Sequence, residues 1–280
     1  MIAILGTGLL GSGFARALRK KGETVHVWNR TFARAQALEA EGCRAFENAA
    51  DAVRGAERVH VVVSDDAAVD STLAAAQLAS GARVYDHTTT SVEGARRRAS
   101  EWRGKGVRYL HAPVFMGPSN AAEGTGLMLV SGDRAIVEEA TPVLEAMTGK
   151  LVDFGALEGR ASAMKLLGNL FLMALAAGFA DMIALGKAMG VSPEEAGSLF
   201  EHFNPGASLG ARYKRMIEGD YDHPSWDLAM ARKDARLMEG EAAGAALLVL
   251  PGVAAAMDAM IARGHGEQDW TVIAKDLLGK

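Results

Sequence analysis

Hydrophobic and polar positions follow two periods along the first half of the chain. Short runs rich in Val, Ile and Leu end in turn residues, as buried strands do. They are MIAILG, TVHVWN, RVHVVVS, ARVYDHTTT, RYLHAPV and GLMLVSG. Amphipathic stretches lie between them, and several stop at a glycine, as helices do. They are GSGFARALRKKG, TFARAQALEAEG, AVDSTLAAAQLASG and SVEGARRRASEWRGKG. This alternation predicts a mostly parallel sheet with helices on both faces.

The pattern changes near Gly159, after which almost no strand signal remains. One long helix is predicted from about Arg160 to Met189. The next helix has a good start, with Ser192 as N-cap and Pro193 in the first turn. Further helices are expected around residues 212–217, 227–243, 251–262 and 268–277. We therefore predict an α/β domain over residues 1–158 and an all-helical domain over residues 159–280.

Composition narrows the class of protein. The net charge of −4 in 280 residues gives no sign of a nucleic-acid surface. The basic run Arg96–Arg98 is interpreted as a solvated helix face. Cys43 is the single cysteine, so no intrachain disulfide can form, and we expect it to pack as a small hydrophobe in a reducing compartment. The N-terminus lacks the basic region of a signal peptide, so a cytoplasmic location is expected.

One apolar stretch, LLGNLFLMALAAGFADMIAL, could be mistaken for a membrane span. Asn169 and Asp181 interrupt it, and the apolar part between them is short for a bilayer. A helix that is buried on most sides is the preferred interpretation. Such a helix, rich in alanine and glycine, needs cover from several neighbours, and we expect a homodimer built on the helical domain.

The first predicted strand leads into Gly6-Thr7-Gly8-Leu9-Leu10-Gly11, which matches G-x-G-x-x-G before a helix. In this motif the first glycine allows a tight turn, the second lets a phosphate approach the backbone, and the third lets the helix pack on the strand. The helix N-terminus then offers free N–H groups to a pyrophosphate. The alternative is a tight turn without a ligand. The motif predicts a dinucleotide site.

The second predicted strand ends in Asn29, Arg30 and Thr31, where NAD-binding proteins of this type place a carboxylate on the ribose. A guanidinium and a hydroxyl suit a 2′-phosphate instead. The sequence therefore favours NADP (NADPH) over NAD, although Arg30 could simply be a solvated residue at the start of the next helix.

Four further motifs follow in order: VVVSDDAAVDSTL, DHTTTS, GRASAMKLLGN and ARKDARLM. With the opening glycine turn, they resemble the β-hydroxyacid dehydrogenase family, which is related to 6-phosphogluconate dehydrogenase and the imine reductases. The resemblance covers nearly the whole chain and implies a Rossmann-like doubly wound sheet followed by a helical domain. It places Ser64 in a loop over the cofactor, Thr89 near the nicotinamide ribose, and Lys165 and Asn169 on a catalytic helix. Lys233 would reach back toward the cofactor.

The residues themselves agree with that role for Lys165 and Asn169. Residues four apart lie on one helical face, so both can point into one site. Both are polar in an apolar helix, and burying them without partners would be costly. A lysine can donate a proton to a carbonyl oxygen during reduction and take it back during oxidation. Burial should lower its pKa. The alternatives are a snorkelling lysine and an asparagine that only bonds between helices.

The substrate loop departs from the family, which usually reads D-A-P-V-S-G-G-x-x-G-A-x-x-G. Here HAPVFMGPSNAAEGTG has His111 for the acid, and a structural hydrogen bond is expected there. Phe115 and Met116 replace the residues that grip a carboxylate, so a larger or more apolar substrate is expected. The candidate substrate-binding residues are Phe115, Met116, Gly117, Ser119 and Asn120.

The leading hypothesis is an NADP-dependent oxidoreductase acting on a carbonyl or hydroxyl group of a small molecule. An imine reductase is the second hypothesis, and Lys165 favours oxygen chemistry over it. A non-catalytic NADP-binding sensor is the third. The histidines show no metal-ligand spacing, and the chemistry needs no metal.

Overall fold

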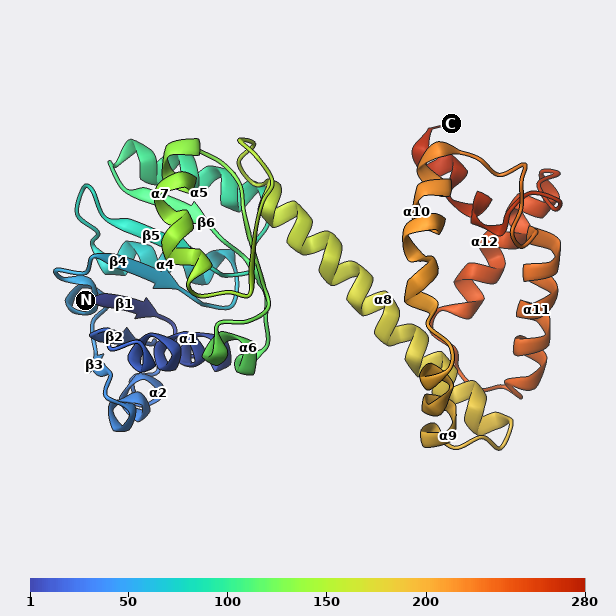
Figure 1. Ribbon diagram of the computed structural model, residues 1–280, viewed down its shortest axis with the longest axis horizontal. Helices are drawn as coiled ribbons and strands as arrows, with labels where there is room; N and C mark the ends of the chain where they lie inside the picture. The colour runs from blue at the N-terminus through green and yellow to red at the C-terminus, as the bar shows by residue number, and fades with distance from the viewer. Residues whose placement is uncertain (280) are drawn as a thin grey trace. The chain divides into compact units, whose positions relative to one another are not determined.

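The structure is a computed structural model that describes residues 1–279. It divides into two compact units, one from Met1 to Asn169 and one from Leu170 onward (Figure 1). A six-stranded parallel sheet lies at the centre of the first unit, in the order β3-β2-β1-β4-β5-β6. Its strands are β1 (Ile2–Leu5), β2 (Val25–Trp28), β3 (Arg44–Phe46), β4 (Arg58–Val61), β5 (Arg83–Asp86) and β6 (Arg108–His111). The predicted doubly wound α/β fold is confirmed.

Helices connect these strands and cover the two faces of the sheet. They are α1 (Leu9–Lys20), α2 (Phe32–Gln36) with the 3₁₀ helix η1 (Ala37–Glu41), α3 (Ala49–Val53), α4 (Asp66–Ala76) and α5 (Val92–Gly104). The central strand β1 shows why helices must pack on both faces of the sheet. Its side chains alternate, so that Ile2 and Ile4 pack in one apolar core with Phe14, while Ala3 and Leu5 pack in the other with Leu73. Such double burial explains the continuous apolar run in the sequence.

A second, three-stranded sheet completes the first unit, in the order β7-β8-β9. Its strands are β7 (Val114–Phe115), β8 (Leu127–Val130) and β9 (Lys150–Asp153). The helices α6 (Pro118–Glu123) and α7 (Arg134–Glu145) connect them. Strand β7 runs antiparallel to β8, and β9 runs parallel to it. The sequence predicted β8 in this sheet.

The remaining elements are helical, as predicted. They are α8 (Arg160–Ala188), α9 (Pro193–Ser198), η2 (Leu199–Glu201), η3 (Pro205–Ser208), α10 (Leu209–Glu218), α11 (Leu228–Glu241), α12 (Leu250–Ala262) and η4 (Trp270–Leu278). Ser192 caps α9 as expected, because its hydroxyl accepts a hydrogen bond from the Glu195 amide at 3.1 Å. The second unit has a small apolar core, which includes the buried residues Tyr221, Leu228, Met257 and Val272.

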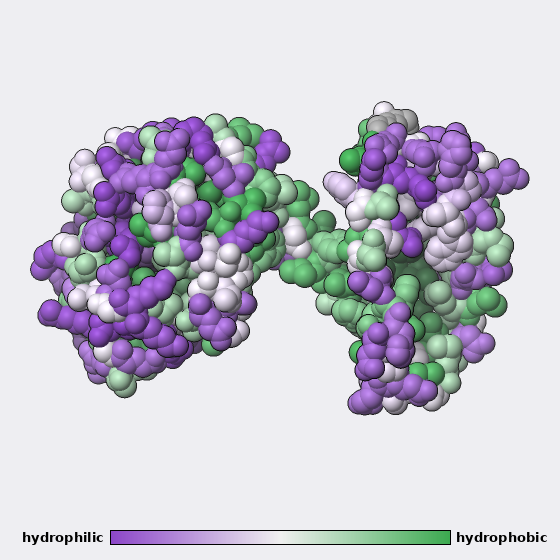
Figure 2. Space-filling model, viewed as in Figure 1, coloured by the Kyte–Doolittle hydropathy of each residue, from purple (hydrophilic) through white to green (hydrophobic). Residues whose placement is uncertain are grey.

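The long helix α8 differs from its prediction. In the single chain its apolar side chains are not buried on most sides, and Figure 2 shows them along the surface. The exposed large side chains after Asn169 include Leu170, Phe171, Leu172, Met173, Leu175, Phe179 and Ile183. By length and composition alone α8 could cross a membrane, a property that core helices of soluble proteins share. Asp181 in this helix accepts hydrogen bonds from three backbone amides, those of residues 248–250 at the start of α12.

Candidate active site

A cavity of about 690 Å³ lies at the carboxyl edge of the parallel sheet. Its walls come from the loops that follow β1, β2, β4 and β5, together with Val114, Met116 and Lys165. This edge is where open α/β sheets bind ligands, and the volume is typical of a site for a cofactor or small molecule. The candidate residues that line the cavity are Gly6, Gly8, Leu9, Leu10, Asn29, Arg30, Thr31, Ser64, Thr89, Met116 and Lys165.

The glycine turn after β1 has the shape that a pyrophosphate requires. Gly6 has a φ of +103°, and a Cβ there would overlap the Val62 carbonyl oxygen. A Cβ on Gly11 would overlap the Gly6 carbonyl oxygen, so this glycine serves close packing of α1. Gly8 is the N-cap of α1, and no described atom lies within 4 Å of the position its Cβ would take. That open cradle beside the N-terminal amides fits a phosphate group.

The loop after β2 is tied to this turn. The side-chain oxygen of Asn29 accepts a hydrogen bond from the Thr7 amide at 3.1 Å, and its side-chain nitrogen donates to the Thr31 carbonyl at 3.0 Å. Arg30 and Arg34 both line the cavity, and no carboxylate of residues 1–279 pairs with either of them. Arg34 was not among the predicted residues. A second arginine close after Arg30, in the predicted helix that follows β2, was the signal that could have found it.

Of the two predicted catalytic residues, Lys165 lines the cavity and Asn169 is not among the lining residues. Its side chain is buried, and its Nζ donates a hydrogen bond to Asn169 Oδ1 at 2.9 Å. The Nζ also lies 4.0 Å from the centroid of the Phe115 ring. Burial lowers the pKa of Lys165 below its ordinary value, because the apolar surroundings disfavour the ammonium. The sequence thus placed the two residues together correctly on one face of α8.

The predicted substrate loop makes several contacts within itself. The Gly117 amide donates to Asn120 Oδ1 at 2.9 Å, and Asn120 Nδ2 donates to Thr125 Oγ1 at 3.0 Å. Ser119 is exposed in the first turn of α6. Of the five predicted substrate-binding residues, Met116 lines the cavity. Substrate contacts of Phe115, Gly117, Ser119 and Asn120 stay predictions.

Lys233 lies on α11 in the second unit, and its Nζ pairs with the Asp234 carboxylate at 2.8 Å. Its approach to the cofactor stays a prediction. Residues 1–279 contain no group of three or more His, Cys, Asp or Glu side chains that could hold a metal ion.

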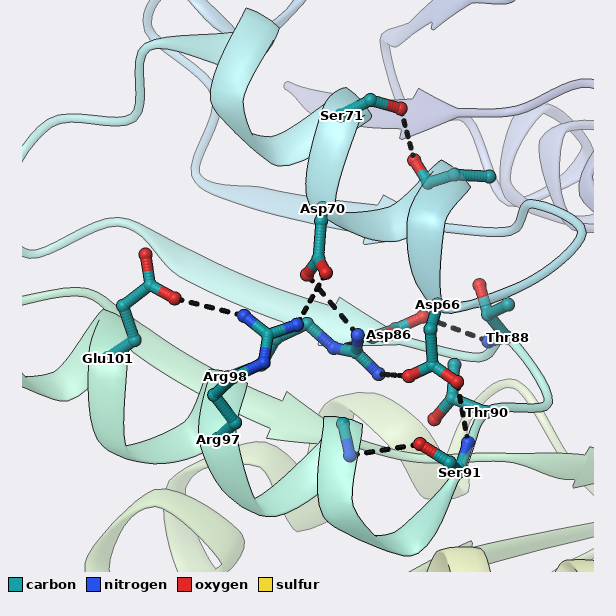
Figure 3. Close-up of polar contacts among 12 residues, drawn as sticks. Asp66, Asp70, Ser71, Asp86, Thr88, Thr90, Ser91, Arg97, Arg98 and Glu101 are labelled. Carbon is teal, nitrogen blue, oxygen red and sulfur yellow. Dashed lines mark hydrogen bonds and ion pairs between the residues drawn. The ribbon is translucent and has the colours of Figure 1, made fainter.

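The interpretation of Arg96–Arg98 as a solvated face is wrong for Arg98, whose side chain is fully buried. It donates to Asp66 at 2.6 Å and lies 4.0 Å from the Asp86 carboxylate (Figure 3). It also donates to the Tyr109 hydroxyl at 3.2 Å. Burial disfavours its charge, but these oxygens outweigh burial and raise the pKa of Arg98.

Two partners of Arg98, Asp66 and Asp86, also bind backbone amides of the loop after β5. Asp66 accepts a hydrogen bond from the Ser91 amide at 2.8 Å, and Asp86 accepts one from the Thr88 amide at 2.9 Å (Figure 3). Thr88 Oγ1 in turn accepts from the Val63 amide at 3.1 Å. Thr88 and Val63 both line the cavity. One buried guanidinium therefore braces the two loops that follow β4 and β5.

Three buried histidines come from β4, from the loop after β5 and from the end of β6. His87 Nδ1 lies 2.8 Å from the Ala112 carbonyl oxygen, which can only accept, so this nitrogen carries the proton. His87 Nε2 then accepts from His60 Nδ1 at 2.9 Å. His111 Nε2 lies 2.9 Å from the Thr88 carbonyl oxygen, the structural hydrogen bond expected for it. His87 also lines the cavity, a position that the sequence did not indicate.

We expect the free energy of unfolding to fall as the pH decreases from 6.5 to 4. Burial lowers the pKa of His87 from 6.5 to about 4, and it lowers the pKa of His60 and His111 in the same direction. Between these values the unfolded chain binds a proton that the folded chain does not, so folding becomes less favourable as acid is added. His87 alone contributes a loss of about 3 kcal/mol over this window. Denaturant titrations at half-unit pH steps measure the free energy of unfolding across this window. An unfolding free energy that is constant or rises toward pH 4 contradicts this.

Residues 1–155 match the family model of the NAD-binding domain of 6-phosphogluconate dehydrogenase. Glyoxylate/succinic semialdehyde reductase 1 of Arabidopsis thaliana is 26% identical over 245 residues, which cover 84% of this chain and 83% of that protein. NAD-dependent L-serine dehydrogenase of Pseudomonas aeruginosa is 28% identical over 98% of this chain and 96% of its own length.

A solved structure extends the comparison. It is the reductive aminase of Aspergillus terreus in complex with NADPH4, cyclohexanone and allyl amine. Its sequence is 26% identical, the match covers 99% of this chain and 98% of that one, and the TM-score is 0.88. The matched residues contain the glycine turn and every residue that lines the cavity except Lys165. The chain belongs to the β-hydroxyacid dehydrogenase family and is an NAD(P)-dependent oxidoreductase.

Proposed function

We propose that this oxidoreductase uses NADP and interconverts a carbonyl group and the corresponding hydroxyl group of a small molecule. The observation that carries the proposal is Lys165, a buried amine in the wall of the cavity that the glycine turn opens. When bound, the nicotinamide supplies or accepts the hydride. The Nζ of Lys165 donates a proton to the substrate oxygen in reduction and takes it back in oxidation. Burial lowers the pKa of this ammonium, so its proton is released more easily.

The other residues hold these partners in place. The N-terminal amides of α1 and the open space at Gly8 would hold the pyrophosphate, and Ser64 and Thr89 would lie along the nicotinamide half. Asn169 accepts a hydrogen bond from the Lys165 ammonium and so orients it along the face of α8. Met116 gives the cavity an apolar wall, which favours a substrate with an apolar part.

The preference for NADP is supported by Arg30, Thr31 and Arg34 at the cavity. Two guanidiniums that no carboxylate of residues 1–279 neutralises can bind a 2′-phosphate with charge-assisted hydrogen bonds. The double variant Arg30→Ala/Arg34→Ala is expected to weaken NADPH binding by about ten- to a hundred-fold. Its NADH binding should stay nearly unchanged, because NADH carries no 2′-phosphate.

Fluorescence titration of both cofactors measures this difference. Arg54→Ala is the matched control, because Arg54 is an exposed arginine that pairs with Asp51 outside the cavity. An equal loss of affinity for NADH and NADPH in the double variant would count against the 2′-phosphate assignment.

Imine reduction is the second candidate function, and the similarity to the reductive aminase of Aspergillus terreus favours it. A panel of aldehydes, ketoacids and preformed imines, followed by NADPH absorbance, separates the two. Turnover of carbonyls supports the proposal, and turnover of imines alone replaces it. A non-catalytic sensor is supported if NADPH binds and no member of the panel is reduced.

We further propose that the chain forms a homodimer through the helical unit. Large apolar side chains of α8 after Asn169 are exposed along the helix, and exposed apolar patches of this kind mark interaction sites. Size-exclusion chromatography with light scattering should give twice the chain mass of 29.4 kDa. A monomeric mass at micromolar concentration would rule the dimer out.

A further inference from the structure

The Lys165 ammonium is buried without a carboxylate partner. Its side chain is 8% exposed, and none of the ion pairs among residues 1–279 includes it. Asn169 Oδ1 lies 2.9 Å away and accepts one of its three protons. The face of the Phe115 ring takes the place where a buried ammonium would usually find an anion, with its centroid 4.0 Å from Nζ.

Two elements define the position of the Phe115 ring, the strand that carries it and the helix it lies against. Phe115 belongs to β7, and its backbone pairs with Leu127 in β8. The ring itself lies against Gly168 of α8, where an added Cβ would overlap the ring atoms Cζ and Cε1. Gly168 comes three residues after Lys165, so both face the same neighbour from one side of the helix. The glycine therefore makes room for the ring beside the amine.

A ring face and a carboxylate act differently on a neighbouring ammonium. The π-face carries partial negative charge and attracts a cation that lies within about 6 Å of its centroid. It compensates part of the lost hydration but carries no full charge. A carboxylate at the same distance would hold the proton on the amine much more firmly. The ring keeps the ammonium in place and leaves its proton available.

We propose that Phe115 is a positioning residue for Lys165, whose ring face holds the ammonium at the cavity wall in place of a carboxylate. This inference rests on the proposed role of Lys165 as proton donor. It gives Phe115 a second task besides the predicted contact with substrate, and it explains why α8 has a glycine at position 168.

The charged surroundings of Lys165 are simple enough to test the proposal by titration. The other ionisable side chains that line the cavity are Arg30 and Arg34 from α2 and its preceding loop, and His87 from the loop after β5. The strand β7 and the helix α8 contribute the uncharged groups Phe115 and Asn169. Removing the π-face should therefore favour the neutral amine.

The test replaces Phe115 by fluorinated phenylalanines with one, three and five fluorines, introduced by amber suppression. Fluorine keeps the ring close to its size but withdraws the negative charge from its face. The apo protein carries ¹³C-labelled lysine, and the Lys165 resonance is the one that Lys165→Arg removes. The titration midpoint of this resonance should fall stepwise with fluorination, by about 1 pH unit for the pentafluoro ring. Gly168→Ala, which must displace the ring, should lower it in the same direction.

A fluorinated Phe46 is the matched control, because this ring contacts Arg44 on the edge strand β3 and not Lys165. It should leave the Lys165 midpoint unchanged. A midpoint that does not move along the Phe115 series overturns the proposal. In NADPH-dependent reduction, the alkaline limb of the kcat profile should shift to lower pH by the same amount.

The NMR readout separates this inference from the proposed function. If Lys165→Ala keeps full turnover while the midpoint still follows fluorination, the proton-donor role fails and the ring contact stands. If Lys165→Ala abolishes turnover and the midpoint stays constant, the proposed function stands and the role of Phe115 fails.

Discussion

Lys165→Ala should lower kcat for NADPH-dependent carbonyl reduction by about 10²–10⁴-fold, the usual contribution of a positioned proton donor. The variant removes the only amine among the described residues that line the cavity, so the substrate oxygen must take its proton from water. NADPH affinity should change little, because the glycine turn and the loop after β2 provide the cofactor contacts. Steady-state kinetics and a direct NADPH titration measure the two effects separately.

Lys187→Ala is the matched control for this experiment. Lys187 lies on the same helix α8 but is exposed, and its removal should leave kcat unchanged. Asn169→Ala should have an intermediate effect of about ten-fold, because the amine keeps its place beside the ring but loses one hydrogen bond. Unchanged turnover in Lys165→Ala would exclude the lysine as proton donor.

The sequence predicted the elements whose periodicity is long and regular. All strands of the parallel sheet except β3 were predicted, and so was the extent of α8 almost to the residue. The missed elements are short or partly exposed, such as β3 with three residues and β7 with two. In so few residues the burial pattern has no period to detect, and pairing with a neighbouring strand decides the structure.

The candidate site shows the same division between local and distant information. The glycine turn depends on spacing within one segment, and so does the contact between Lys165 and Asn169, four residues apart on α8. The family resemblance, and not spacing, implied that Lys165 lies at the same cavity as the glycine turn. The contact of Phe115 with Lys165 joins residues fifty positions apart, so no local pattern could indicate it.

The burial of Arg98 depends on both local spacing and distant partners. Consecutive residues of a helix point in different directions, and Ala95, Arg98 and Trp102 share the buried face of α5. That spacing was available in the sequence. The oxygens that receive the guanidinium were not, because they come from α4, β5 and β6.

Arg98→Met should destabilise the first unit by about 3–5 kcal/mol, the cost of removing one partner from a buried ion pair. The methionine fills much of the space, but among residues 1–279 the fully buried Asp86 carboxylate then keeps the Tyr109 hydroxyl and the Thr88 amide as its hydrogen-bond partners. The loops after β4 and β5 lose their common brace, so NADPH affinity should fall together with stability. Urea titration gives the free energy of unfolding, and fluorescence gives the affinity.

The neighbouring Arg97→Met tests whether burial is the cause. Arg97 pairs with Asp70 and Glu101, but its side chain is 46% exposed, and exposed ion pairs contribute about 0–1 kcal/mol. The two variants remove the same charge from adjacent positions of one helix and differ chiefly in the solvent around it. If both lose the same stability, net charge rather than the buried contact explains the effect. If Arg98→Met alone is destabilised and binds NADPH normally, the cluster supports the fold without bracing the cofactor loops.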